Sequence, residues 1–137
     1  MRRNRLDVPR RLARQALDRT RLELGRVVAE RRHLEEAHAA LRDTRARETF
    51  EDAAELHLLA SYHERSRKVE RDLIRRLCEV SAEETALGRR LGERRLALRR
   101  LELLEERERA RARGDAARRE QRDLDDLVLI RRAQSAR

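Results

Sequence analysis

The sequence predicts an all-α protein in which two long helices form an antiparallel coiled-coil hairpin. Three observations support this fold class. Aliphatic side chains recur every three or four residues along two long stretches, which is the heptad pattern of a coiled-coil seam. The single proline, Pro9, lies near one end of the chain and interrupts neither stretch. Charged residues make up 46% and aromatic residues 1% of the 137 residues, so the chain lacks the material for a thick globular core.

The first helix is expected over about residues 7–45, after an N-terminal arm. Asp7 is a suitable N-cap, and Pro9 fits within the first turn, where a missing backbone N–H costs nothing. The helix dipole disfavours cations at this end, so local stability does not explain the arginines found there, which are Arg10, Arg11 and Arg14. The heptad seam consists of Leu17, Thr20, Leu24, Val27, Leu34 and Leu41, with Arg31 and His38 in the two remaining positions.

No glycine or proline marks the turn between the helices. The heptad pattern lapses over residues 44–55, where Thr49, followed by Asp52 three residues later, offers the N-cap of a second helix. The sequence therefore places the turn at about residues 44–50. The alternative position is residues 61–66, which would make the two helices more nearly equal in length.

The second helix is expected over about residues 50–132. Its seam consists of Leu56, Leu59, Tyr62, Val69, Leu73, Leu77, Val80, Leu87, Leu91, Leu98 and Leu101, with Glu84 and Arg94 in polar positions. The pattern slips by four residues between Leu73 and Leu77, a stutter that locally unwinds a supercoil. Opposite charges four residues apart should support the helix by about 0.2 to 0.5 kcal/mol for each pair. These pairs are Glu64 with Lys68, Asp72 with Arg76 and Glu105 with Arg109.

Three glycines fall within this second helix. Gly88 and Gly92 each weaken it by about 1 kcal/mol relative to alanine. They mark a bend or a close helix crossing, or they are tolerated because they are exposed. Gly114, within the sequence Arg-Ala-Arg-Gly-Asp, is the expected position of a break or flexible point in the helix. The whole chain, residues 1–137, is still expected to form one elongated domain.

The net charge of +9 is concentrated toward the two ends of the sequence. Residues 1–21 carry a net charge of +6 and residues 107–122 a net charge of +4, whereas residues 22–106 carry −1. In an antiparallel hairpin, these two basic segments would form one basic tip.

The densest apolar patch lies near the C-terminus and consists of Leu124, Leu127, Val128 and Ile130. Two alternatives are open for such a patch at the end of a coiled coil. It packs on the start of the first helix, near Leu6, Val8 and Leu12, or it docks into another protein.

Nothing in the sequence indicates catalysis, a cofactor or a metal site. A two-helix rod offers no sheltered pocket in which catalytic groups could converge. The histidine pairs, His33 with His38 and His57 with His63, do not have the i, i+4 spacing usual for zinc on a helix. The single cysteine, Cys78, excludes an internal disulfide. Since no run of eighteen apolar residues and no signal-peptide pattern occurs, we expect a cytoplasmic protein.

The layout resembles the small stalk proteins of type III secretion and flagellar export, the YscO and FliJ family. The C-terminal motif that carries the resemblance is Gln121 with the run Leu124-Asp125-Asp126-Leu127, followed by Arg131-Arg132. At the other end, Leu6 and Val8, followed by Arg14 and Ala16, are similar to the N-terminal start of the family.

The resemblance implies a central stalk whose two termini insert into the hexameric export ATPase, at the inner-membrane export apparatus, while the hairpin end points to the export gate. It implies that the ATPase contacts Arg3, Arg10, Arg14, Leu124, Leu127, Val128 and Arg131. It implies that the gate, a membrane protein, contacts Leu41, Leu56, Leu59 and Tyr62. Secretion chaperones are further candidate partners. The isolated chain is expected to be a monomeric hairpin.

Two other functions stay open from the sequence. A structural homo-oligomeric coiled coil would also use polar seam residues such as Arg31, His38, Glu84 and Arg94. A non-specific nucleic-acid-binding protein would fit the net charge, but the chain has no aromatic platform, zinc knuckle or basic-region motif, and acidic residues interrupt nearly every basic stretch. No specific nucleic-acid partner is therefore expected.

Overall fold

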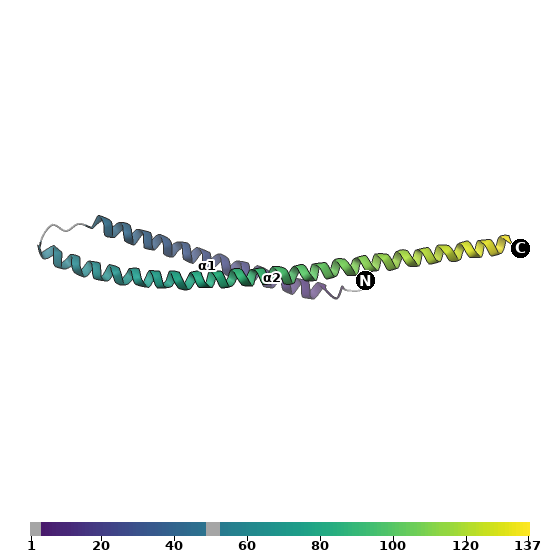
Figure 1. The fold of residues 1–137 in the computed structure, drawn as a ribbon, viewed down its shortest axis with the longest axis horizontal. Coiled ribbons are helices and arrows are strands. Elements are labelled where there is room, and N and C mark those ends of the chain that lie inside the picture. Colours follow the sequence, from purple (N-terminus) through teal and green to yellow (C-terminus); the bar gives the residue numbers. More distant parts are fainter. Residues whose placement is uncertain (1–3, 49–52) are drawn as a thin grey trace. The chain divides into compact units, whose positions relative to one another are not determined.

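Two long helices make up the described part of the chain. The structure is a computed structural model that describes residues 4–48 and 53–137, with side chains from residue 57 onward in the second range. Helix α1 spans Asp7–Arg47 and helix α2 spans Ala53–Ser135, and the described residues contain no strand (Figure 1). The two helices pack closely as an antiparallel hairpin, so the predicted fold class is confirmed.

The helix boundaries shift the predicted turn by a few residues. Because α1 ends at Arg47 and α2 begins at Ala53, the connection covers residues 48–52 and overlaps only the end of the predicted range. The alternative turn at residues 61–66 lies inside α2. The proposed N-cap at Thr49 lies outside the described residues.

The predicted break at Gly114 is not present, because α2 continues through this residue as a helix. A side chain at this position would meet only the Nη2 atom of Arg118, at 3.9 Å, which is an ordinary contact. The glycine does not adopt a positive φ angle. Alanine and arginine, which are strong helix formers, occupy most neighbouring positions, so one glycine does not interrupt the helix.

The start of α1 is closed by Asn4 rather than by Asp7. The Asn4 side-chain oxygen accepts a hydrogen bond from the backbone N–H of Leu6 at 3.2 Å, and its carbonyl accepts one from Asp7 at 3.0 Å. Asp7 is already helical, so it is not the predicted N-cap. Its carboxylate lies 3.9 Å from Arg10 in the first turn, where the helix dipole favours an anion. Pro9 lies in this first turn, as expected.

The chain divides into two compact units. The hairpin unit contains Gln15–Arg95, and the terminal unit contains Met1–Arg14 and Leu96–Arg137. The hairpin unit has eighteen basic and seventeen acidic residues, a net charge of +1. The terminal unit has eighteen arginines and ten acidic residues, a net charge of +8. Nearly all of the net charge therefore belongs to the terminal unit.

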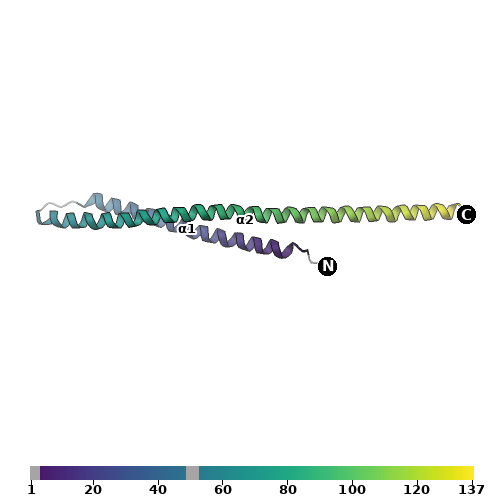
Figure 2. The same ribbon diagram turned by 60° about the horizontal axis from the view of Figure 1, so that its bottom comes forward.

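The core of the hairpin unit follows the predicted heptad seams. Among the described residues of this unit, Leu17, Thr20, Ser66, Val80 and Leu91 are buried, and all of them except Ser66 are predicted seam positions. The α1 and α2 segments of this unit lie side by side (Figures 1 and 2). The remaining seam positions of α1 are half-buried, in agreement with a narrow apolar stripe between two helices.

Two predicted seam positions of α2 are wrong. Val69 is 50% exposed, and Arg94 is also exposed. Ser66 is buried and Glu70 half-buried, because Glu70 binds side chains of α1 and thereby turns the neighbouring Val69 outward. With Glu70 in the seam, the steps to Leu73 and Leu77 are three and four residues, so the structure gives no reason for a stutter at that point.

The polar seam residues pair across the two helices. Arg31 donates from Nε to Glu84 at 2.6 Å, and Arg45 donates to Glu70 at 2.8 Å. The interval from Arg31 to Arg45 is two heptads, as is the interval from Glu84 back to Glu70, so the same antiparallel register joins both pairs. His38 Nε2 lies 3.2 Å from the other oxygen of Glu70. The polar positions in the predicted seams are thus matched within one chain.

These contacts also change the proton affinities of the paired groups. The pKa of Arg31 is raised by hydrogen bonds to Glu35 and then Glu84. The pKa of Glu70 is lowered, mainly by the hydrogen bond from Arg45 and next by that from His38. Both shifts favour the charged forms at neutral pH and so keep the cross-helix pairs ionic.

The three predicted ion pairs within α2 have different outcomes. Arg109 binds Glu105 at 2.5 Å, as predicted. Asp72 pairs with Arg75 instead of Arg76, because Arg76 reaches across to Glu30 of α1 at 2.6 Å. Glu64 and Lys68 form no ion pair in the described part of the chain.

Gly88 and Gly92 are exposed and do not mark a close helix crossing. A Cβ added at either glycine would meet no atom of α1 and no side chain beyond its chain neighbours within 4 Å. Of the two interpretations open from the sequence, the structure supports tolerated, exposed glycines.

Candidate interaction surfaces

The last part of α2 has no packing partner in the terminal unit. Asn4 and Arg10, at the start of α1, bind α2 at Glu105. From residue 106 to the C-terminus every residue is exposed except the half-buried Gly114. Residues 106–135 correspond to about 45 Å of helix. This part of α2, drawn in green to yellow in Figure 1, is called the free segment below.

The free segment is stabilised by its own side chains. Asp115 accepts a hydrogen bond from Arg118 at 2.6 Å, and Gln121 donates one to Asp125 at 2.9 Å. The pKa of Asp115 is lowered, mainly by Arg118 and further by Arg119 and Arg111, so the carboxylate stays charged. Such contacts within one helix explain how the segment stays helical without a packed apolar face.

The C-terminal apolar patch remains exposed. Its residues Leu124, Leu127, Val128, Leu129 and Ile130, here called the C-terminal cluster, are each at least half exposed. Val8 and Leu12 of α1 are also more than half exposed. The alternative in which the patch packs on the start of α1 is therefore wrong. The reason is the register, because α1 begins opposite Glu105, about 28 Å along the helix from Leu124.

Most of the C-terminal cluster lies on one side of the helix. With 100° per residue, four of its side chains share one side, and Leu129 points to the opposite side. Asp123 precedes the cluster, Asp125 and Asp126 lie between Leu124 and Leu127, and Arg131 with Arg132 follow the cluster. A broad exposed apolar side on a helix is normally covered by other protein, so the cluster is suited to a partner that packs along this side.

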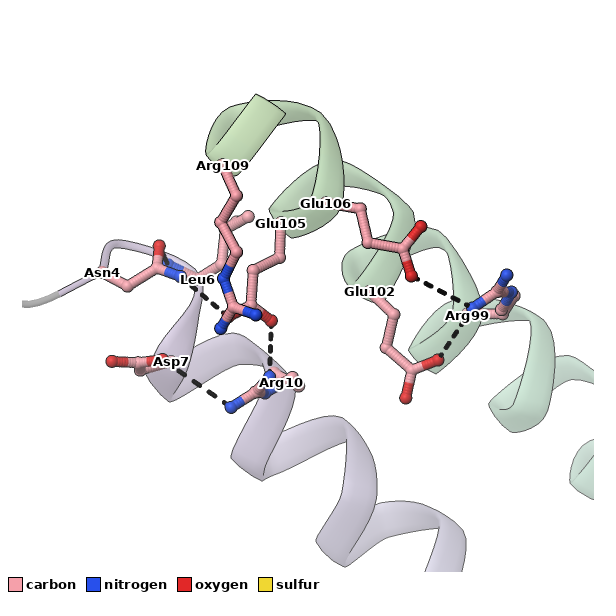
Figure 3. A network of polar contacts seen from close by, with 9 residues as sticks. All are labelled: Asn4, Leu6, Asp7, Arg10, Arg99, Glu102, Glu105, Glu106 and Arg109. Carbon is pink, nitrogen blue, oxygen red and sulfur yellow. Dashed lines mark hydrogen bonds and ion pairs between the residues drawn. The ribbon is translucent and has the colours of Figure 1, made fainter. Parts of the chain in front are cut away.

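A cluster of polar contacts joins the start of α1 to α2 in the terminal unit. Glu105 is only 4% exposed, and its carboxylate accepts hydrogen bonds from three side chains (Figure 3). Arg10 and Arg109 each donate at 2.5 Å, and the Asn4 amide donates at 3.1 Å. A buried carboxylate with three donors is stable only while these donors stay in place, so Glu105 fixes the end of α1 on α2.

The residues implied at the ATPase end are not gathered in one patch. Arg10 binds Glu105, whereas Arg14 is exposed. Arg131 lies on the free segment beside the C-terminal cluster, far along α2 from Glu105. Arg3 lies outside the described residues.

The residues implied at the gate end lie mostly in the helix seam. Leu41 of α1 and Leu59 and Tyr62 of α2 are half-buried, so a partner would reach only part of each side chain. The side chain of Leu56 lies outside the described residues. Leu58, which the heptad pattern does not select, is the more exposed leucine at this end.

The described residues contain no group of three or more histidine, cysteine, aspartate or glutamate side chains arranged to hold a metal ion. Cys78 is a free, exposed thiol. Neither α1 nor α2, as far as they are described, has a stretch apolar enough to cross a membrane.

Sequence reasoning missed the role of Glu105. A signal was present, because Glu105 is the next heptad position after Leu98 and Leu101. Arg10 lies three heptads before Arg31, and Glu105 lies three heptads after Glu84. Because the helices are antiparallel and the two intervals are equal, the register that pairs Arg31 with Glu84 also pairs Arg10 with Glu105. Asn4 has no comparable pattern.

Comparisons with family models, with curated proteins and with solved structures give no match for this chain.

Proposed function

We propose that the protein is the central stalk, or coupling component, of a type III secretion export apparatus. In this proposal the terminal unit binds the hexameric export ATPase, and the hairpin end binds the export gate. The observation that carries the proposal is the exposed C-terminal cluster on a helix segment without a packing partner. The place of action would be the cytoplasmic side of the inner membrane, and secretion chaperones are further candidate partners.

The charge of the terminal unit supports this assignment. Its net charge of +8 suits a partner ring lined by acidic loops. Charge complementarity of this kind mainly orients a partner and accelerates association, while affinity comes from apolar contact. The C-terminal cluster would provide that contact.

The paired seam supports a stalk that acts as a single chain. Arg31 and Glu84 would be costly in the seam of a homo-oligomer unless matched, and the structure matches them within the hairpin. A self-contained hairpin leaves the C-terminal cluster available for a different protein.

Leu127→Asp tests the proposal, and Leu22→Asp is its matched control. The two leucines are 61% and 59% exposed, so neither change should unfold the hairpin. In the native host, Leu127→Asp should abolish co-purification of the export ATPase and stop secretion, whereas Leu22→Asp should retain both. Unchanged ATPase association in a folded Leu127→Asp variant would refute the proposal.

The concentrated positive charge also favours a second candidate, a non-specific nucleic-acid-binding protein. Purely electrostatic binding would weaken steeply with added salt and show no sequence preference. Co-purified partners that disappear on nuclease treatment would support this candidate over the stalk. Association that increases with protein concentration in sedimentation experiments would instead indicate a homo-oligomeric coiled coil.

A further inference from the structure

One face of α2 in the terminal unit carries a row of arginines that the stalk proposal uses only through the net charge of that unit. This arginine row consists of Arg100, Arg107, Arg111, Arg118 and Arg122. The intervals of seven and four residues place all five within an arc of about 60° on the helix. All five are exposed, and they extend over about 33 Å.

Acidic residues are excluded from this face. Between residues 96 and 122, the six acidic side chains all lie outside the arc of the arginine row. The nearest is Asp115, at the edge, where it pairs with Arg118. Among the described residues, the other four arginines of the row have no ion-pair partner. Most of the positive charge of the row is therefore not paired with a carboxylate.

An apolar row runs beside the arginines. It consists of Leu96, Leu103, Ala110 and Ala117, which recur every seven residues. Leu96 is 60% exposed and Leu103 is 38% exposed, although α1 packs on the other side of α2 at Glu105. The small side chains of Ala110 and Ala117 would let another backbone approach closely. A seven-residue apolar repeat flanked by charge is the pattern of a helix that pairs with another helix.

We propose that this face of α2 binds an acidic amphipathic helix of another protein. The apolar row would contact the apolar stripe of that helix, and the arginine row would pair with acidic side chains at heptad spacing along its edge. A polyanion such as nucleic acid would use the arginines but would gain nothing from the heptad repeat of Leu96 and Leu103. The proposal can be tested separately from the stalk function, because its residues are distinct from the C-terminal cluster and share with the stalk proposal only the net charge of the terminal unit.

A designed peptide tests this proposal on the full-length protein. The probe is a labelled four-heptad helix with leucine at positions a and d and glutamate at e and g, and binding is followed by fluorescence anisotropy. The expected result is saturable binding that slows hydrogen exchange over residues 96–122. The same peptide with lysine in place of glutamate should not bind, because like charges would then meet. Equal binding of both peptides would overturn the proposal.

Two double variants of equal charge change locate the site. Arg107→Glu with Arg111→Glu reverses two charges of the arginine row. Arg113→Glu with Arg119→Glu reverses two charges on other sides of the same segment. We expect the first to weaken peptide binding by about tenfold or more and the second by less than about threefold. Similar losses in both, with helicity unchanged by circular dichroism, would show that only net charge matters and would refute the site.

Further measurements distinguish an acidic helix from the other ligands that this face could bind. Leu103→Gln should weaken binding of the acidic peptide but should not change binding of a short DNA duplex. The proposal fails if the duplex or vesicles containing phosphatidylserine bind through the arginine row while the acidic peptide does not. It also fails if the protein alone dimerises through this face in sedimentation experiments and thereby blocks the peptide.

Discussion

Val80 and Val128 lie on the same helix, α2, in very different surroundings. Val80 is fully buried in the hairpin unit, whereas Val128 is 50% exposed on the free segment. Both regions are built from leucine, alanine, arginine and acidic residues. The difference shows that composition does not decide burial in this protein. Burial depends on whether α1 lies beside the residue, and α1 begins too late along α2 to reach the free segment.

The charged residues of the two regions differ in the same way. In the hairpin unit, Arg31 binds Glu84 on the other helix, whereas in the free segment Arg118 binds Asp115 on its own helix. Pairs between helices fix the register of the hairpin, and pairs within a helix support only local helicity. The hairpin unit is therefore stabilised by packing, and the free segment keeps its apolar and basic surfaces available for partners.

The largest expected effect comes from placing a charge at each of the two valines. Val80→Asp should lower the free energy of unfolding by about 3 kcal/mol or more, because a carboxylate would be buried in the seam without a partner. Val128→Asp should change it by less than about 0.5 kcal/mol. Urea denaturation followed by circular dichroism measures both. Equal losses of unfolding free energy in the two variants would show that Val80 and Val128 do not differ in burial.

The next largest effect concerns the boundary of α1 packing at Glu105. Glu105→Gln removes the charge that Arg10 and Arg109 bind and should cost about 1 to 2 kcal/mol. Hydrogen exchange should become faster in residues 7–14. The control is Glu106→Gln, since the Glu106 side chain is 63% exposed and should contribute little. Unchanged exchange in Glu105→Gln would mean that apolar contacts alone hold the start of α1.

A smaller effect is expected at the glycines. Gly88→Ala and Gly92→Ala should each raise the free energy of unfolding by about 0.5 to 1 kcal/mol, since a methyl group meets no neighbour. Gly114→Ala should increase the helicity of the free segment without raising the stability of the hairpin. Denaturation midpoints and helix content measure the two responses separately. Destabilisation by Gly88→Ala would reveal a contact at that position.

The smallest effect is the pH dependence of the cross-helix pair at Glu70. Arg45 and His38 lower the pKa of Glu70 below its ordinary value of 4.5. A carboxyl group whose folded-state pKa is lowered stabilises the fold above 4.5, and this contribution is lost as the pH falls through the folded-state pKa. Between about pH 3 and pH 6, the free energy of unfolding should therefore change less with pH in Glu70→Gln than in the natural protein.

The pH dependence of unfolding should not respond to Asp115, which is paired only within α2. The pKa of Asp115 is also lowered, but by Arg118 on the same helix. Asp115→Asn should accordingly leave the pH dependence of hairpin unfolding unchanged. If it altered that dependence as much as Glu70→Gln does, the free segment would be coupled to the hairpin.

Heptad spacing was sufficient to predict much of the hairpin. The pattern identified two helices, the α1 seam from Leu17 to Leu41 and the polar positions at Arg31 and Glu84. It failed at Val69 because two adjacent residues, Val69 and Glu70, both fit the helical repeat. Hydrophobicity favours the valine, but the cross-helix partners of Glu70 decide the outcome.

The candidate surfaces were predictable to different degrees. The C-terminal cluster was evident from its composition. Its exposure could not be predicted, because packing on the start of α1 was an equal alternative. The arginine row follows from spacing alone, but its accessibility depends on which side of α2 is covered by α1.

The sequence by itself determined the helical state, the two apolar seams and the concentration of positive charge near the chain ends, because these follow from local propensity and from residue spacing on a helix. Only the tertiary structure decided the register, in which Glu105 rather than Leu124 faces the start of α1. The register depends on which distant side chains meet, and many alignments of two heptad seams bury similar apolar area. The ion pairs of Glu105, Glu84 and Glu70 distinguish among those alignments, because each loses its partner when the helices shift.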